Sequence, residues 1–376
     1  MKETAYQMLY LTSCALHGQV PDKDKIAQID LTKLYQMCQF HSLTSMVCMA
    51  LESAGVSEPE WQEAKSKAIR KNIMLDVERE KICNFLEENG IWHISLKGVV
   101  LKEMYPQIGM RQMADNDILY DKAYQDEVLD FMLKNGYKTE NEEITYHDTY
   151  IKPPVLNFEM HTALYSESSD KRISAYYTDV KNRLVKDENK KYSYHFTDED
   201  FYIFMTVHEY KHYNSRGTGL RSLLDTYVYI NQKNNVLDWN YISGELEKLG
   251  IGDFERKSRQ LSMKVFSSAE LPELSEDERK MLDFYLFSGT YGTMEQFVQR
   301  RIEKFQKQTG KNSKLGYIWY RIFPPMEIYE AYFPFFYRHK ILLPVGWAYR
   351  LIRGVTARRK KVQGEIKYLY HSDDKI

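Results

Sequence analysis

The chain has 376 residues, with 52 Lys and Arg against 53 Asp and Glu and a net charge of −1. This length allows two or three domains, and the balanced charge excludes the overall basic surface that is typical of nucleic-acid-binding proteins. The most apolar late stretch, ILLPVGWAY, is too short to span a bilayer, so we expect no integral membrane association.

Residues 1–89 have the periodicity of helices. The stretch LTKLYQMCQFHSLTSMVCMALESAG has apolar residues three and four positions apart and ends at Gly55, and a second periodic run from Trp61 to Asn89 ends at Gly90. All four cysteines lie in this region without a Cys-x-x-Cys pair, which is typical of reduced thiols in a cytoplasmic protein. We therefore predict an N-terminal helical region over 1–89 and a cytoplasmic location.

Residues 90–196 alternate between short strands and helices. IWHISLKG (91–98) predicts a strand that ends in a glycine turn, VVLKEMY a short helix, and NDILYD (116–121) a second strand. A helix across AYQDEVLDFMLKNG follows, and VLNFEMHTAL (155–164) predicts a third strand. This region is the predicted α/β core.

Residues 197–376 are predicted to be mostly helical. One helix covers TDEDFYIFMTVHEYKHYN with Thr197 as its N-cap, and a second extends from Leu220 to about Gln232. The basic run RLIRGVTARRKK near the end favours a solvated helix face, with contact to an anionic lipid, a nucleic acid or a polyphosphate as the open alternative.

Acidic side chains gather on the second and third predicted strands. Residues two apart on a strand point to the same face, so Asp115 and Asp117 are expected side by side, and Glu159 and His161 share the polar face of the third strand. Like charges this close repel unless a cation lies between them. If the two strands are neighbours, the three carboxylates form an oxygen-rich site that suits Mg²⁺ or Mn²⁺.

A Lys97-Gly98 turn lies where the first strand passes into a helix. Glycine allows a phosphate to approach the backbone, and the free N–H groups of a helix N-terminus bind anions. Together with the carboxylates, this turn predicts metal-assisted phosphoryl chemistry on a nucleoside triphosphate.

The segment SLKGVVLKEMYPQIGMRQMADNDILYD is similar to a nucleotidyltransferase family that is widespread in bacteria as stand-alone proteins of roughly this length, within the polymerase-beta-type superfamily. The family's Lys-Gly turn, Tyr-Pro pair, arginine and Asp-x-Asp strand match Lys97, Gly98, Tyr105, Pro106, Arg111, Asp115 and Asp117. The later EMHTAL resembles the family's third strand. The resemblance implies an α+β fold, in which a small mixed sheet over 90–196 is flanked by helical regions over 1–89 and 197–376.

The resemblance also implies an activity, the transfer of a nucleoside monophosphate from a triphosphate to an acceptor by in-line displacement. Asp115 and Asp117 would bind Mg²⁺ or Mn²⁺, and Glu159 would be the third ligand or the base for the acceptor. The residues that would contact the nucleotide in this core are Lys97, Gly98, Arg111 and His161. The neutral net charge favours a small molecule or a protein over a nucleic acid as the acceptor.

Two departures from the family pattern support an alternative. An aliphatic residue usually stands between the aspartates, where this chain has the amide Asn116, and the wider superfamily prefers Gly-Ser or Gly-Gly where this chain has Gly98-Val99. A buried amide without partners costs about 1–3 kcal/mol. The alternative is a catalytically inactive nucleotide-binding or interaction protein on the same fold.

The string HEYKH contains the His-Glu-x-x-His spacing of zinc peptidases at His208 and His212. Lys211 places a positive charge between the histidines, and the downstream spacing of a third zinc ligand is missing, so a zinc hydrolase is the remote alternative. Two other interpretations remain open. Either the histidines pack within a helix interface, or a positive patch of Lys211, His212, Arg216 and Arg221 faces the triphosphate or an acidic acceptor. In the second interpretation His208 is also predicted to contact the nucleotide.

Overall fold

The computed structural model describes residues 1–139, 146–166, 170–290, 292–326, 328–329, 333–356 and 359–371. The chain divides into two compact units, one formed by 1–210 with 219–286 and the other by 211–218 with 287–376. None of the helices in the described ranges combines the length and the apolar character that crossing a bilayer would require. The two units are described separately.

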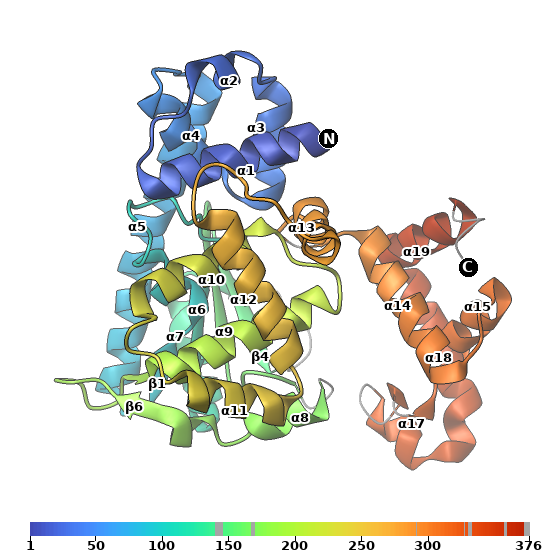
Figure 1. The fold of residues 1–376 in the computed structure, drawn as a ribbon. Helices are drawn as coiled ribbons and strands as arrows, with labels where there is room; N and C mark the ends of the chain where they lie inside the picture. Colours follow the sequence, from blue (N-terminus) through green and yellow to red (C-terminus); the bar gives the residue numbers. More distant parts are fainter. Residues whose placement is uncertain are drawn as a thin grey trace. The chain divides into compact units, whose positions relative to one another are not determined.

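The chain begins with the predicted helices (Figure 1). They are α1 (Lys2–His17), α2 (Lys23–Ala27), α3 (Leu31–His41), α4 (Thr44–Ser53) and the long α5 (Pro59–Glu88). Gly55 and Gly90 follow α4 and α5 with φ of 83° and 75°, the left-handed conformation that glycine adopts without strain. The buried side chains of Met8, Leu34 and Met46 pack inside this bundle.

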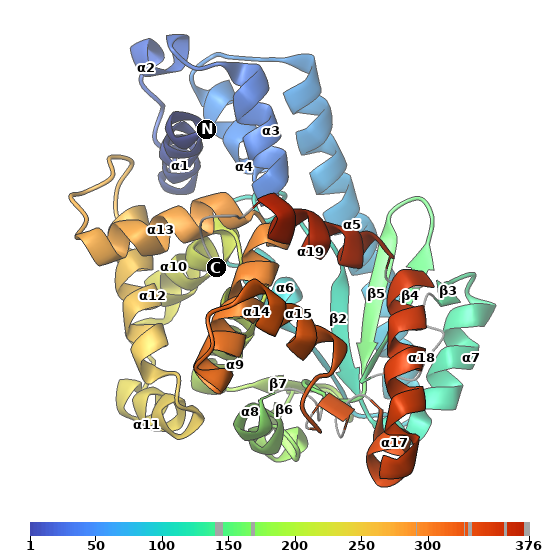
Figure 2. The same ribbon diagram turned by 90° about the vertical axis from the view of Figure 1, so that its right-hand side faces the viewer.

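A mixed five-stranded sheet follows, with the strand order β1-β2-β5-β4-β3. Its strands are β1 (His93–Ser95), β2 (Asn116–Tyr120), β3 (Lys138–Thr139), β4 (His147–Lys152) and β5 (Leu156–His161). β2 and β5 are parallel, and the other neighbours are antiparallel. Figure 2 shows β2, β5, β4 and β3 next to one another. The α+β fold with a small mixed sheet is therefore confirmed.

One face of this sheet is apolar. Leu156, Phe158 and Met160 are almost fully buried in a core that includes side chains of α5 and of α7 (Gln125–Lys134). The alternate residues of β5 point to the other face, as the period of two requires. The polar face that carries Glu159 and His161 is thus fixed by the burial of its neighbours.

The sequence analysis did not predict four of the strands. β3 and β4 extend the sheet beyond β5, and β6 (Leu184–Lys186) pairs with β7 (Tyr194–Phe196) in a separate hairpin. β3, β6 and β7 have only two or three residues each, and β4 (HDTYIK) is largely polar. None of them has the apolar alternation that identified β2 and β5. β4 matters for the site because it carries His147.

Helices complete the first unit. They are α6 (Lys97–Lys102), α8 (Lys171–Tyr176), α9 (Asp198–Tyr213), α10 (Leu220–Lys233), α11 (Trp239–Leu249), α12 (Gly252–Phe266) and α13 (Glu276–Ser288), with 3₁₀ turns at Lys122–Tyr124 and Val180–Arg183. Thr197 caps α9 as predicted, because its Oγ1 accepts a hydrogen bond of 3.1 Å from the backbone N–H of Asp200.

The second unit is helical where it is described. It contains α14 (Met294–Thr309), α15 (Lys314–Ile322), α17 (Pro334–Arg338), a 3₁₀ turn at Lys340–Leu342, α18 (Leu343–Thr356) and α19 (Arg359–His371). Its small core includes Phe305, Tyr317 and Leu369. Beside this core the Glu365 carboxylate accepts hydrogen bonds from Tyr317 and Arg321. The predicted C-terminal helices are confirmed.

Candidate active site

The parallel pairing of β2 and β5 brings two of the predicted carboxylates, Asp117 and Glu159, together. The register places Asp117 directly opposite Glu159, and Leu119 opposite His161. Asp115 lies one residue before β2. The two strands are neighbours, which is the condition that the sequence analysis set for a shared carboxylate site.

His161 points its imidazole at these carboxylates. Its Nε2 lies 3.2 Å from Asp117 Oδ1 and 3.6 Å from Glu159 Oε2. Burial by itself would lower the pKa of His161, but the hydrogen bonds to Asp117 and Glu159 outweigh it and raise the pKa to about 9. The hydrogen bond from His161 in turn lowers the pKa of Glu159.

Asp115 experiences the opposite environment. Burial raises the pKa of Asp115 to about 7, and the negative charges of Asp117 and Glu159 act in the same direction. Arg221 opposes this shift without cancelling it. A carboxyl group held among other carboxylates loses its proton easily only when a cation is near, so this group of side chains suits a bound metal ion.

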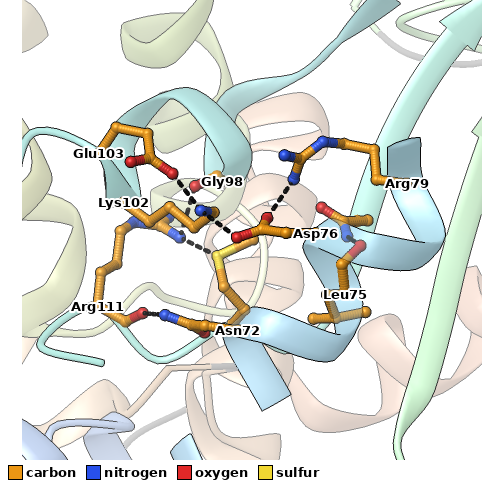
Figure 3. A network of polar contacts seen from close by, with 10 residues as sticks. Asn72, Leu75, Asp76, Arg79, Gly98, Lys102, Glu103 and Arg111 are labelled. Carbon is orange, nitrogen blue, oxygen red and sulfur yellow. Dashed lines mark hydrogen bonds and ion pairs between the residues drawn. The ribbon is translucent and has the colours of Figure 1, made fainter. Parts of the chain in front are cut away.

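Residues 111–117, called the aspartate segment below, are held in place by hydrogen bonds from side chains of α5. Lys71 Nζ donates to the carbonyl of Ala114 at 2.6 Å, and Asn72 Nδ2 donates to the carbonyl of Arg111 at 3.3 Å. Figure 3 shows Asn72 beside the backbone of Arg111, and Asp76 of the same helix between Arg79 and Lys102. Lys71 and Asn72 bind backbone carbonyls of the aspartate segment, so α5 fixes the path of the backbone there.

Asn116 takes part in the same contact between the aspartate segment and α5. Its side chain is fully buried, and its Nδ2 donates a hydrogen bond of 3.1 Å to the carbonyl of Leu75 in α5. Within the described part of the chain, its Oδ1 is buried and has no hydrogen-bond partner. The amide between the aspartates therefore joins β2 to α5, at the cost of one unsatisfied acceptor.

Arg111 forms a buried ion pair with Asp225 of α10. Its Nε and Nη2 donate to the two carboxylate oxygens at 2.8 and 3.0 Å, and Tyr105 OH donates to the same carboxylate at 2.7 Å. Arg111 Nη1 lies 3.5 Å from the carbonyl of Gly98. A Cβ on Gly98 would lie 2.8 Å from Met113 Cε, so a larger residue there would have to displace the end of the Met113 side chain. The sequence analysis did not identify Asp225 as the partner of Arg111.

Lys97 lies at the start of α6, with its Nζ 3.1 Å from Nδ1 of His208 on α9. Burial lowers the pKa of Lys97 to about 8, although the Asp225 carboxylate acts against this shift. The neighbouring Glu209 is buried and accepts hydrogen bonds from Ser258 and Tyr285. The first histidine and the glutamate of HEYKH thus belong to a buried polar network of the first unit.

The other predicted cations lie at different places. Arg221, in the first turn of α10, donates from Nη1 to the carbonyl of Gln112 at 3.1 Å, close to the aspartate segment. Lys211 and His212 lie in the last turn of α9, in the part of that helix that belongs to the second unit. Contact with a nucleotide stays a prediction for Arg221, Lys211 and His212. The same holds for Lys97, Gly98 and Arg111.

The donor set fits a divalent cation. Among the described residues, one group of at least three His, Cys, Asp or Glu side chains places a ligand atom from each within 4.8 Å of the others: Asp117, Glu159 and His161. His147 of β4 lies beside this group, with its ring 5.1 Å from that of His161 and its Nε2 4.0 Å from Glu159 Oε2. His147 was missed because β4 was missed.

Comparison with known proteins identified one family. A family model described as an uncharacterised nucleotidyltransferase matches residues 27–267, which include the sheet, the aspartate segment, α9 and α10. No curated protein and no solved structure gave a significant match.

Proposed function

The chain belongs to this nucleotidyltransferase family, and from that premise we propose that it moves a nucleoside monophosphate from a triphosphate to an acceptor. The observation that supports this best is the register of β2 and β5, which sets Asp117 opposite Glu159. In-line displacement on a triphosphate needs little covalent chemistry from the protein; it needs carboxylates that position metal ions and cations that bind phosphates.

In this proposal the carboxylates form the metal side of the site. Asp115 and Asp117 would hold Mg²⁺ or Mn²⁺, and Glu159 would be a further ligand or would accept the proton of the acceptor hydroxyl. When bound, the metal neutralises charge on the phosphates and orients them. The environment of Asp115 supports this assignment: burial and then the negative charges of Asp117 and Glu159 raise its pKa, and those same charges attract a divalent cation.

The cationic side would be Lys97 and Arg221. Both lie on helices that flank the aspartate segment, at the first residue of α6 and in the first turn of α10. His208 contacts Lys97 Nζ and would hold that ammonium group in place. Arg111 would act indirectly, because its bidentate pair with Asp225 ties the beginning of the aspartate segment to α10.

The first test is calorimetric binding of ATP, CTP, GTP and UTP with Mg²⁺ to the full chain, and to Asp117→Asn and Glu159→Gln variants. Glu103→Gln is the matched control, because this carboxylate is 71% exposed and lies outside the group. We expect metal-dependent binding of at least one triphosphate, weakened at least about tenfold in the first two variants and unchanged in the control. A folded protein that binds none of the four triphosphates would refute the proposal.

A transfer assay then follows pyrophosphate release from the preferred triphosphate, with hydroxyl acceptors of small-molecule and protein type supplied separately. Release that needs an acceptor and is absent in Asp117→Asn supports catalysis. Binding without release across these acceptors favours the inactive alternative. Zinc content is measured on the same sample, because one zinc per chain that persists in Asp117→Asn would point to HEYKH instead.

A further inference from the structure

His161 is aimed into the metal side of the proposed site. It is 9% exposed, and its Nε2 is the ring nitrogen that faces Asp117 and Glu159. Its Nδ1 is buried, with no hydrogen-bond partner among the residues that the structure describes. The imidazole is therefore oriented by the two carboxylates rather than by an ordinary contact on its far side.

The distances are those of ligands that share one ion. Metal–ligand bonds of about 2.1 Å at right angles place adjacent ligand atoms about 3 Å apart. His161 Nε2 lies 3.2 Å from Asp117 Oδ1 and 3.6 Å from Glu159 Oε2. Small movements, with release to solvent of the proton that Nε2 donates to these carboxylates, would place all three atoms around one cation. The ring of His147 lies against that of His161, with an interplanar angle of 29°, and limits its rotation.

We propose that His161 Nε2 is a direct metal ligand, and that the site consequently prefers a first-row divalent transition ion to Mg²⁺. Mg²⁺ strongly favours oxygen ligands, whereas imidazole nitrogen suits transition ions. This inference rests on the proposed function, because it concerns the metal that would serve nucleotide transfer. It assigns His161 to the metal rather than to the nucleotide.

The test uses Mn²⁺ as the probe, bound to the full chain without nucleotide. Pulsed electron paramagnetic resonance detects the ¹⁴N nucleus of a coordinated imidazole. We expect this nitrogen signal in the wild type, its loss in His161→Gln, and its retention in His147→Gln, the matched control with a neighbouring imidazole. Calorimetry should show that the ratio of Mn²⁺ to Mg²⁺ affinity falls about tenfold in His161→Gln alone.

The outcomes separate the ligand role from the proposed function. Bound Mn²⁺ without a nitrogen signal, or a signal that survives in His161→Gln, overturns the ligand role even if triphosphates bind. No Mn²⁺ binding at all also overturns it. A nitrogen signal lost in His161→Gln, in a protein that binds no triphosphate, supports the ligand role while refuting nucleotide transfer.

The second unit carries an exposed apolar stripe on α18. The stripe consists of four residues at positions i, i+3, i+4 and i+7 of the helix: Val345, Ala348, Tyr349 and Ile352. All four are exposed, and Ile352 is 64% exposed. Ile341, in the 3₁₀ turn just before α18, is 93% exposed. An apolar stripe this open on a helix is typical of a surface that contacts a partner.

The charge around the stripe indicates which partner. The sequence between Glu330 and Glu365 contains no acidic residue, and its eight basic residues are Arg338, Lys340, Arg350, Arg353, Arg358, Arg359, Lys360 and Lys361. Anionic lipid head groups attract basic residues near the membrane surface, and apolar residues of an interfacial helix enter the acyl boundary. We infer that α18 docks on an anionic membrane surface.

Sedimentation of the full chain with vesicles tests this inference. We expect binding to vesicles with phosphatidylglycerol and little binding to pure phosphatidylcholine, with a loss of about tenfold in Val345→Ser/Ile352→Ser. Val20→Ser/Val236→Ser is the matched control, because these valines of the first unit are equally exposed. Absence of binding to anionic vesicles, or equal binding to both lipids, overturns the inference. So does a wild-type dimer that the stripe variant abolishes, since the stripe would then be a self-interface.

Discussion

His41 is expected to make the first unit sensitive to mild acid. Its ring is fully buried, with Nε2 2.9 Å from the carbonyl of Leu286 and Nδ1 accepting a 3.3 Å hydrogen bond from the backbone N–H of Leu220. Nδ1 can accept that bond only while the ring is neutral. Burial accordingly lowers the pKa of His41 to about 4, from about 6.5 in an unfolded chain.

The size of the effect follows from this difference in pKa. The unfolded chain binds the proton more tightly, so the stability is complete above about pH 6.5 and is lost as the pH falls toward 4. The full difference corresponds to about 3 kcal/mol, of which about 2 kcal/mol is lost between pH 7 and pH 5. Protonation of His41 should also disturb the candidate site, because the lost hydrogen bond is to Leu220. This residue begins α10, the helix that carries Arg221 and Asp225.

Urea unfolding of the full chain at pH 7, 6 and 5 measures this dependence. His41→Gln can still donate to Leu286 but cannot gain a proton, so it should lose about 2 kcal/mol less than the wild type between pH 7 and 5, whatever its stability at pH 7. His17→Gln is the control, because His17 also contacts a backbone carbonyl, that of Phe266, but stays accessible to water. Equal losses in the wild type and His41→Gln would refute the reasoning.

Three further predictions concern the site. Asp225→Ala should lower the free energy of unfolding by about 3–5 kcal/mol in urea titrations, because it leaves Arg111 buried without its partner, and Arg111→Met in the same chain should recover part of the loss. Affinity for the preferred triphosphate, measured by calorimetry, should weaken as the pH rises from 7 to 9, because Lys97 loses its charge through a pKa of about 8; Lys97→Met should bind weakly with a flatter dependence between these pH values. Asn116→Leu should change the free energy of unfolding in urea by no more than about 1 kcal/mol, because removal of the unsatisfied Oδ1 offsets the lost hydrogen bond to Leu75. Asn116→Asp should be far less stable in the same titration, because it buries a charge.

Local patterns were enough to predict how the acidic side chains lie on their strands. The alternation of β5 fixed which face carries Glu159 and His161, and the Asp-x-Asp strand was recognisable by itself. What the sequence left open was whether these two strands are neighbours, and the register now answers it.

The supporting contacts could not be predicted from the sequence, because they join distant segments. Arg111 and Asp225 are 114 positions apart, and no periodicity tells which buried acid an arginine reaches. Asn116 is a departure from the family pattern, but only the structure provides its partner, the Leu75 carbonyl. Lys97 and His208 come from two motifs that the sequence analysis treated separately, and they meet within the first unit.

The contacts between α5 and the aspartate segment limit where residues can be inserted into or deleted from the chain. Near its beginning, α5 packs Trp61 against Tyr35 of the N-terminal bundle, and further along it holds the segment through Asn72 and Leu75. One residue inserted or deleted between Trp61 and Asn72 would turn one contact surface by about 100° relative to the other. Insertions and deletions should therefore be tolerated in the loops around α5 but not within these turns, where the helix sets the angle between the bundle and the carboxylates.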